Sequence, residues 1–189
     1  METRHLLPHD LEVAFAINEE YLSASRQEFF AWYQANADLF VGIFDNTALI
    51  GICYGMNWPR QPGYVVLEGI ATRDAYWRSG AGSQLIGFFE DQVRQRGQQW
   101  VTVGVAPDLK TENFYLKNGY RPTHLCAKVS RRDLPPAYLQ LGYDFCEVRE
   151  EGEDVVFYVA ATVHDKVLQA QLKEDLGADE VIFIMEKAL

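Results

Sequence analysis

The alternation of apolar and polar residues predicts two helices near the N-terminus. Apolar residues recur at helical spacing over residues 10–22 and 25–37, with Asp10 and Ser25 as candidate N-caps. A short strand is expected before them, at about residues 4–7. The chain should therefore begin with one strand and two amphipathic helices.

The next stretch has the continuous apolar runs that are typical of buried strands. Residues 39–44 and 48–55 flank the polar turn 45–47, which predicts a β-hairpin. A third strand is expected over residues 64–72, after a segment that contains two prolines and a glycine. These runs predict a sheet.

A β-α-β unit is expected after the hairpin. Helical spacing extends from Gly82 to Gly97, and a strand over residues 99–105 follows it. The order strand, glycine-rich turn, helix, strand predicts a partly parallel sheet. A short helix is then expected from Asp108 to Asn118, because Gly119 is a natural stop.

The C-terminal third continues the mixed pattern. The expected segments are a strand at 123–129, a hairpin of 143–149 and 154–162, a helix, and a last strand at 181–185. The last strand is apolar on both faces, as the interior of a sheet requires. We therefore expect residues 1–130 to form a core and residues 131–189 to complete its sheet without being an independent domain.

Composition indicates one globular chain with an acidic surface. The protein has 189 residues, of which 48% are hydrophobic, and a net charge of −10 at pH 7. A chain of this length can bury a single core. Nucleic-acid binding needs clustered Lys and Arg, so the acidic balance opposes a nucleic-acid partner and favours a cationic substrate.

Cysteine, histidine and the N-terminus narrow the class further. Cys53, Cys126 and Cys146 are odd in number and widely spaced, which suggests neither a disulfide framework nor a zinc site. The four histidines have no metal-binding spacing, so no metal is expected. The N-terminus lacks a secretory pattern, and no apolar run approaches about 18 residues. We expect a cytoplasmic protein with no membrane partner.

The glycine-rich turn Trp77–Ser83 is the first candidate for chemistry. It joins a strand to a helix start, where backbone N–H groups lack intrahelical partners and can bind phosphate. Gly80 and Gly82 would let a pyrophosphate approach closely, and Arg78 can donate charge-assisted hydrogen bonds. The alternative is a tight turn that only lets the helix pack close to the sheet.

The residues around this turn resemble a known motif. The stretch Leu67–Ile86 resembles the acetyl-CoA-binding motif of the GNAT N-acetyltransferase superfamily. The residues in register with it are Glu68, Ile70, Ala71, Tyr76, Gly80 and Gly82. The departures are Trp77 in place of Gln or Arg, Arg78 one position later, Thr72 in place of Val, and Asp74 in place of Pro.

A second stretch, Asp108–Arg121, resembles the second signature of the same family, Phe-Tyr-x-Lys-x-Gly-Phe/Tyr. The resemblance implies that Tyr115 protonates the departing thiolate of coenzyme A. Adjacent helix positions point about 100° apart, so Phe114 can pack on the sheet while Tyr115 faces the ligand. The alternative makes Tyr115 an amphipathic core residue whose hydroxyl reaches water.

The resemblance implies a fold and a co-substrate. The fold is α/β (α+β): a GNAT fold with a central mixed, mostly antiparallel, twisted sheet flanked by helices, and a C-terminal hairpin-helix-strand extension. Acetyl-CoA is the implied co-substrate. The residues implied to bind it are Ile70, Ala71, Thr72, Trp77, Arg78, Ser79, Gly80, Ala81, Gly82, Ser83, Phe114 and Lys117.

The implied reaction is transfer of an acetyl group to an amine of a small-molecule or peptide acceptor. An amine must lose a proton before it attacks a thioester, and the resemblance makes Glu68 the base. The alternative for Glu68 is a structural ion pair. Gly69 would permit a bulge beside it. No Cys or Ser has an evident activating base, so we expect direct transfer in a ternary complex.

Other functions stay open. The same fold could serve as a non-catalytic acyl-CoA-binding or interaction protein. Residues 18–37 and 56–63 are expected to select the acceptor. The extension could cover the acceptor site, form a homodimer or only widen the sheet.

Overall fold

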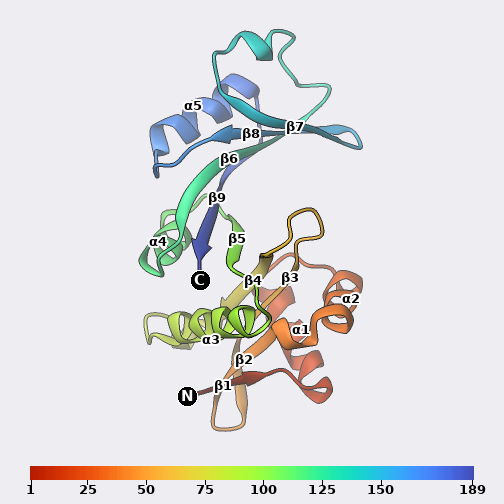
Figure 1. Ribbon diagram of the computed structural model, residues 1–189, viewed down its shortest axis with the longest axis vertical. Coiled ribbons are helices and arrows are strands. Elements are labelled where there is room, and N and C mark those ends of the chain that lie inside the picture. The colour runs from red at the N-terminus through yellow and green to blue at the C-terminus, as the bar shows by residue number, and fades with distance from the viewer. The chain divides into compact units, whose positions relative to one another are not determined.

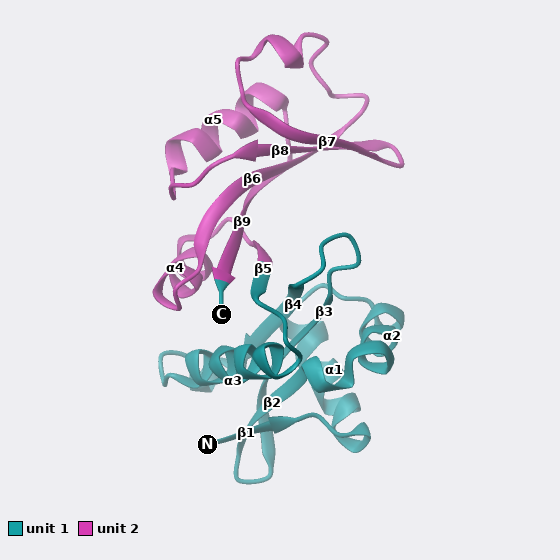
Figure 2. Cartoon of the chain, viewed as in Figure 1, with its two compact units in different colours: residues 1–102, 188–189 teal, residues 103–187 magenta.

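The computed structural model describes residues 1–189, which form two compact units (Figures 1 and 2). Unit 1 comprises residues 1–102 and 188–189, and unit 2 comprises residues 103–187. The sequence predicts a boundary after residue 130, where the resemblance to a family core ends. A division into compact units does not test that boundary. That boundary stays a prediction.

Unit 1 contains a sheet whose strands are antiparallel except for the last pair. The strands follow the order β1 (Glu2–His5), β2 (Phe40–Asp45), β3 (Ala48–Asn57), β4 (Tyr64–Thr72) and the first half of β5 (Trp100–Val105). β4 and β5 pair in parallel through Tyr64–Val66 and Trp100–Thr102. The predicted β-α-β unit is therefore confirmed.

Three helices accompany this sheet: α1 (Leu11–Tyr21), α2 (Arg26–Asn36) and α3 (Ala81–Gln95). Short 3-10 turns cover Pro8–Asp10 (η1), Ala37–Leu39 (η2) and Asp74–Tyr76 (η3). Ser25 caps α2 as predicted, because its hydroxyl accepts a bond from the N–H of Glu28 at 3.3 Å.

Two N-terminal predictions need correction. Asp10 occupies the N-cap position of α1 but does not cap it: its carboxylate accepts bonds from Arg4 at 2.7 Å and from the N–H of Leu7 at 2.8 Å. The opening strand ends at His5, two residues earlier than expected, because Pro8 starts a 3-10 turn.

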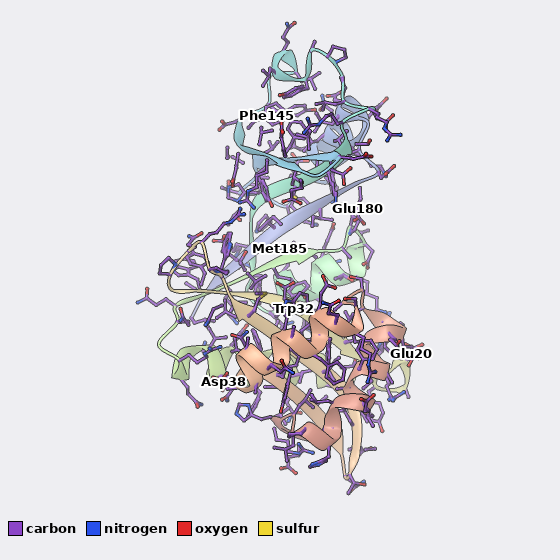
Figure 3. All side chains as sticks on the ribbon, turned by 90° about the vertical axis from the view of Figure 1, so that its right-hand side faces the viewer. Glu20, Trp32, Asp38, Phe145, Glu180 and Met185 are labelled. Carbon is purple, nitrogen blue, oxygen red and sulfur yellow. The ribbon has the colours of Figure 1, made fainter.

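The helices cover opposite faces of the sheet of unit 1 (Figure 1). Tyr54 of β3 lies among aromatic rings, 5.1 Å from those of Phe29 and Phe40. Trp32 of α2, labelled in Figure 3, lies at the edge of this cluster, 6.2 Å from Tyr54. Neighbouring strand residues point to opposite faces, and Gly55 faces the α3 side chain Phe89. α1 and α2 therefore cover one face and α3 the other.

A β-bulge interrupts the pairing of β3 with β4. Tyr54 pairs with Gly69 and Gly55 pairs with Leu67, so Glu68 has no residue opposite. A Cβ on Gly69 would lie 2.7 Å from the Tyr54 ring. Gly69 thus leaves room for the tyrosine ring beside the bulge. The sequence predicted that Gly69 would permit a bulge, and it did not predict the contact with Tyr54.

Unit 2 contains an antiparallel sheet in the order β9 (Glu180–Ala188), β6 (Arg121–Ser130), β8 (Asp154–Ala160), β7 (Phe145–Glu151). Its helices are α4 (Leu109–Lys117), the 3-10 turn η4 (Tyr138–Gln140) and α5 (Lys166–Leu176). Leu125, Phe157, Leu172 and Phe183 are fully buried and belong to its core. The predicted hairpin, helix and last strand are all present.

The mixed α/β class predicted from the sequence is confirmed, with mainly antiparallel strands, one parallel pair and flanking helices. None of the helices combines the length and the apolar character needed to cross a bilayer.

Gly69→Ala should lower the free energy of unfolding by about 1–3 kcal/mol, because the new methyl group would overlap the packed Tyr54 ring. The matched control is Gly87→Ala inside α3, where a Cβ meets no atom within 4 Å; this change should raise stability by about 0.5–1 kcal/mol. Urea titration measures both. Equal stabilities would show that the bulge does not require glycine.

Candidate functional site

The turn between β4 and α3 is held open to solvent by its backbone conformation. Gly80 is the N-cap of α3 with φ 90°, and Arg78 also has a positive φ, 61°. A Cβ on Gly80 would meet no atom within 4 Å, so glycine is required there by conformation and not by space. Trp77, Arg78, Ser79 and Gly80 are all exposed.

The N-cap residue of α3 is a glycine, which has no side chain to cap the helix. The N-cap side chains of Ser25, Asp108 and Asp165 cap α2, α4 and α5, whereas the N-cap residues of α1 and α3 make no such bond, and the first turn of α3 carries no acidic residue. The N–H of Gln84 is the first to bond back along the helix, to Gly80 O at 3.0 Å. An uncapped N-terminus with a positive dipole end can hold an anion.

Side-chain hydrogen bonds brace this turn from three sides. The Ser79 hydroxyl donates to Tyr76 O at 2.6 Å, and the Tyr76 hydroxyl donates to Asp45 Oδ2 at 2.9 Å. The indole N–H of Trp77 donates to Thr72 O at 3.0 Å. Trp77 therefore ties the turn to the end of β4, which gives a structural reason for this departure from the family motif.

The remaining predicted residues of unit 1 follow the turn and the strand that leads into it. Ile70 and Thr72 are partly buried and Ala71 is buried, while Gly82 is partly buried and Ser83 is exposed at the start of α3. Ala81 is buried, and its N–H donates to the Ser79 hydroxyl at 3.3 Å. Within unit 1 the pairing of β4 with β5 ends at Val66.

Glu68 projects from the bulge of β4 on its more exposed face. Leu67 and Gly69 on either side of it are buried, whereas Glu68 is exposed to solvent. Although water reaches the side chain, surrounding protein atoms desolvate its carboxylate and raise its pKa, and the negative charge of Glu28 raises it further. Desolvation of the carboxylate is the larger of these two causes. A carboxylate with a raised pKa is a stronger base than an ordinary glutamate, as proton abstraction requires.

A buried tyrosine lies beneath this bulge. The Tyr54 hydroxyl donates to Asn18 Oδ1 at 2.6 Å, and both residues are buried. Burial raises the pKa of Tyr54, and the negative charge of Glu68 raises it further, so this hydroxyl stays protonated. Sequence reasoning misses this pair because Tyr54 lies in an apolar run and Asn18 in an ordinary helix.

The second predicted motif forms α4 in unit 2. Asp108 caps the helix, since its carboxylate accepts a bond from the N–H of Thr111 at 2.9 Å. Tyr115 is 4% exposed, with its ring 5.4 Å from that of Tyr120. Phe114 is only partly buried and Lys117 is exposed, so burial within the Phe114–Tyr115 pair is the reverse of the expectation.

Sequence reasoning also misses a buried carboxylate on α4. Glu112 is fully buried and contacts His164 and Lys166. Its signal was present only as a charged residue three positions before Tyr115, which does not reveal burial. Of the two predicted proton-transfer residues, Glu68 belongs to unit 1 and Tyr115 to unit 2.

Comparison with known proteins agrees with this geometry. The family model "Acetyltransferase (GNAT) family" matches residues 4–120. Two curated relatives match shorter segments: a tRNA(Met) cytidine acetyltransferase TmcA 2 of Saccharolobus solfataricus is 34% identical over 53 residues, and TmcA of Thermofilum pendens is 36% identical over 56 residues. These segments cover 28% and 30% of this chain, and 7% of each relative.

Solved structures share the fold at low sequence identity. Ard1 from Thermoplasma volcanium has a TM-score of 0.60 and 17% identity, over 87% of this chain and 98% of that one. Arabidopsis thaliana Naa50 in complex with the bisubstrate analogue CoA-Ac-MVNAL has a TM-score of 0.58 and 13% identity, over 85% and 97%. An IAA acetyltransferase from Bacillus cereus has a TM-score of 0.58 and 12% identity, over 100% and 99%.

Gly80→Ala should lower the affinity for inorganic pyrophosphate, because an alanine disfavours the left-handed conformation that sets the start of α3 by about 1–2 kcal/mol. Gly63→Ala is the matched control, since Gly63 has φ 89°, equally open surroundings, and lies at the other end of β4. Both variants should lose similar stability, and only Gly80→Ala should lose affinity. Calorimetry showing equal affinities would contradict an anion site at this turn.

Proposed function

The chain belongs to the acetyltransferase (GNAT) family, and from this premise we propose that it transfers an acetyl group from acetyl-CoA to an amine of a small-molecule or peptide acceptor. The observation that carries the proposal is the start of α3. Its N-cap is an exposed glycine in the left-handed conformation, so no side chain of the N-cap residue occupies the helix start. This arrangement suits the pyrophosphate of a coenzyme A.

Backbone and side chains would hold the co-substrate in complementary ways. The N–H groups of residues 80–83 bind the pyrophosphate, and the exposed Arg78 adds charge-assisted bonds. The backbone of Ile70, Ala71 and Thr72 pairs with the pantetheine arm in the manner of an added strand. The indole N–H of Trp77 already donates to Thr72 O. The pantetheine arm must therefore either displace this bond or share the oxygen with it. Phe114 and Lys117 complete the contacts from α4.

The proposed reaction uses Glu68 as a general base and Tyr115 as a general acid. Glu68 accepts a proton from the acceptor amine, directly or through water, and the free amine attacks the thioester carbonyl. Backbone N–H groups of residues 70–72 stabilise the oxyanion of the tetrahedral intermediate. The carbon–sulfur bond then breaks, and the Tyr115 hydroxyl protonates the departing thiolate. The attacking nitrogen releases its second proton as the amide forms, and this proton restores the Tyr115 hydroxyl. The products are an amide and free coenzyme A, and no covalent acyl-enzyme is needed.

The acceptor class rests on three observations. The net charge of −10 favours a cationic acceptor. Naa50, which shares the fold, is complexed with an analogue that joins coenzyme A to a peptide. The local likeness to two tRNA cytidine acetyltransferases covers less than a third of this chain, and the acidic charge opposes an RNA partner. A peptide or small amine is therefore the acceptor we propose, in the cytoplasm and without nucleic acid or membrane.

A non-catalytic acyl-CoA-binding protein is the alternative. It would show tight binding of acetyl-CoA without thiol release from any amine. A panel of peptide and small-molecule amines, with free thiol measured by a chromogenic disulfide reagent, separates the two functions.

Glu68→Gln should lower kcat/KM by about 10²–10⁴-fold, because general-base catalysis contributes on this order. Protonated Glu68 cannot accept the amine proton, so the wild-type rate should fall as the pH falls through the pKa of Glu68. Because that pKa is raised, the fall should begin at a higher pH than for an ordinary glutamate. A pH–rate profile of the variant should lack this acid limb.

Glu28→Gln provides the control for this profile. Glutamine can keep the reciprocal bonds with Ser25 at the start of α2, whereas the negative charge that raises the pKa of Glu68 is lost. The acid limb should therefore move to lower pH with little change in the maximal rate. An unchanged limb would argue against Glu68 as its source.

Tyr115→Phe should lower kcat by about 10²–10⁴-fold while leaving the affinity for acetyl-CoA nearly unchanged, because only the proton donor is lost. Tyr143→Phe is the control in the same unit, since it removes a hydroxyl bonded to Asp175 at 2.5 Å that has no proposed catalytic role. Steady-state kinetics and acetyl-CoA calorimetry measure both. A Tyr115→Phe enzyme as fast as the wild type would exclude Tyr115 as the acid.

A further inference from the structure

The most deeply buried carboxylate of the protein lies on α4 and is bonded to two basic side chains. Glu112 is 0% exposed. Lys166 Nζ donates to both of its oxygens, at 2.8 and 3.0 Å, and His164 Nε2 lies 2.8 Å from Oε2. Burial of a carboxylate is costly unless it is paired in this way. The three side chains therefore form one linked group, which we call the Glu112 cluster.

The partners come from the segment that opens α5, and their placement there is informative. Lys166 is the first residue of α5, where the positive end of the helix dipole disfavours a cation. The two bonds to Glu112 offset that disadvantage. The His164 ring also packs on Phe183 of β9, with centroids 4.9 Å apart. The segment 164–166 thus contacts both α4 and the sheet of unit 2.

The cluster lies one helical turn from Tyr115. Residues three apart share a face of a helix and are offset by about 4.5 Å along its axis. Glu112 and Tyr115 are the two buried residues of α4, so together they define the face by which this helix packs. α4 has only nine residues, and a helix this short takes its position from packing, not from its own stability. Loss of the cluster should therefore turn or shift Tyr115.

We propose that Glu112 is a positioning residue for acyl transfer: with Lys166 and His164 it fixes the rotation of α4 and thereby the placement of the Tyr115 hydroxyl. The inference rests on the acid role of Tyr115 in the proposed function. It also gives the segment before α5 a part in the reaction, although none of its side chains needs to touch a substrate.

The first test compares Glu112→Gln with the wild type in the acetyl-CoA-dependent thiol-release assay. A shift of about 1 Å at a reacting group can cost about 10²-fold in rate, so kcat should fall by about tenfold or more. KM for acetyl-CoA should change little, because the N-terminus of α3 is untouched. Lys166→Met should act in the same direction, Lys166→Arg should restore most of the rate, and the exposed Lys173→Met should have no effect.

A double-mutant cycle with Tyr115→Phe separates positioning from general damage. If Glu112 acts through the Tyr115 hydroxyl, Glu112→Gln should cause no further loss of kcat once that hydroxyl is absent. Equal losses in the two backgrounds would overturn the proposal. Should Glu112→Gln fold poorly, the pair Glu112→Leu with Lys166→Leu replaces the charges by apolar side chains and can be put through the same cycle.

Failure of this inference is distinguishable from failure of the proposed function. If Tyr115→Phe lowers kcat and Glu112→Gln does not, only the positioning role of Glu112 is overturned. If Tyr115→Phe is as fast as the wild type, the acid role falls and the inference falls with it. Hydrogen exchange adds a readout that needs no activity. Amides of α4 should exchange faster in Glu112→Gln than in Lys173→Met, and equal exchange would contradict the proposal that the Glu112 cluster holds α4 in place.

Discussion

The packing of one tyrosine ring against one glycine sets the geometry of unit 1. Tyr54 belongs to the aromatic cluster between the sheet and the helices α1 and α2, and its ring would lie only 2.7 Å from a Cβ on Gly69. The pairing of β3 with β4 bulges beside this contact, which leaves Glu68 without an opposite residue. A bulge re-aims the side chain it carries. The exposure of Glu68 in an otherwise half-buried strand therefore goes with the bulge beside the packed tyrosine ring.

The same strand delivers the turn that begins α3. β4 ends at Thr72, the short turn η3 follows, and Gly80 reverses the chain into the helix with a positive φ. Bonds from Trp77, Ser79 and Tyr76 hold this turn without using the N–H groups of Gly82 or Ser83. Capping side chains stabilise helix starts, and a glycine at the N-cap gives up about a few tenths of a kcal/mol of this stabilisation. A ligand anion can supply the missing partner, which links stability of the turn to binding.

Patterns in the sequence carried most of the fold and part of the site. Strict apolar runs and glycine stops located the strands and helices within a few residues, and Ser25 and Gly119 act as the sequence suggested. The predicted cap of α1 was wrong because several donors compete for one carboxylate. Asp10 could cap α1, yet Arg4 and Leu7 bind its carboxylate. Periodicity cannot show which of two possible partners is closer in space.

Charge shows the limit of sequence most clearly, because two glutamates of similar appearance meet opposite environments. Glu68 is exposed at a bulge, where desolvation by surrounding protein atoms and the charge of Glu28 raise its pKa, which makes its carboxylate a stronger base than an ordinary glutamate. Glu112 is enclosed and bonded to Lys166 and His164 from a segment more than 50 positions away. Removing one member of such a buried set costs more than replacing all of it. A carboxylate of the first kind can turn over protons, whereas one of the second kind can only hold its neighbours in place, and the difference is decided by tertiary contacts that no local motif contains.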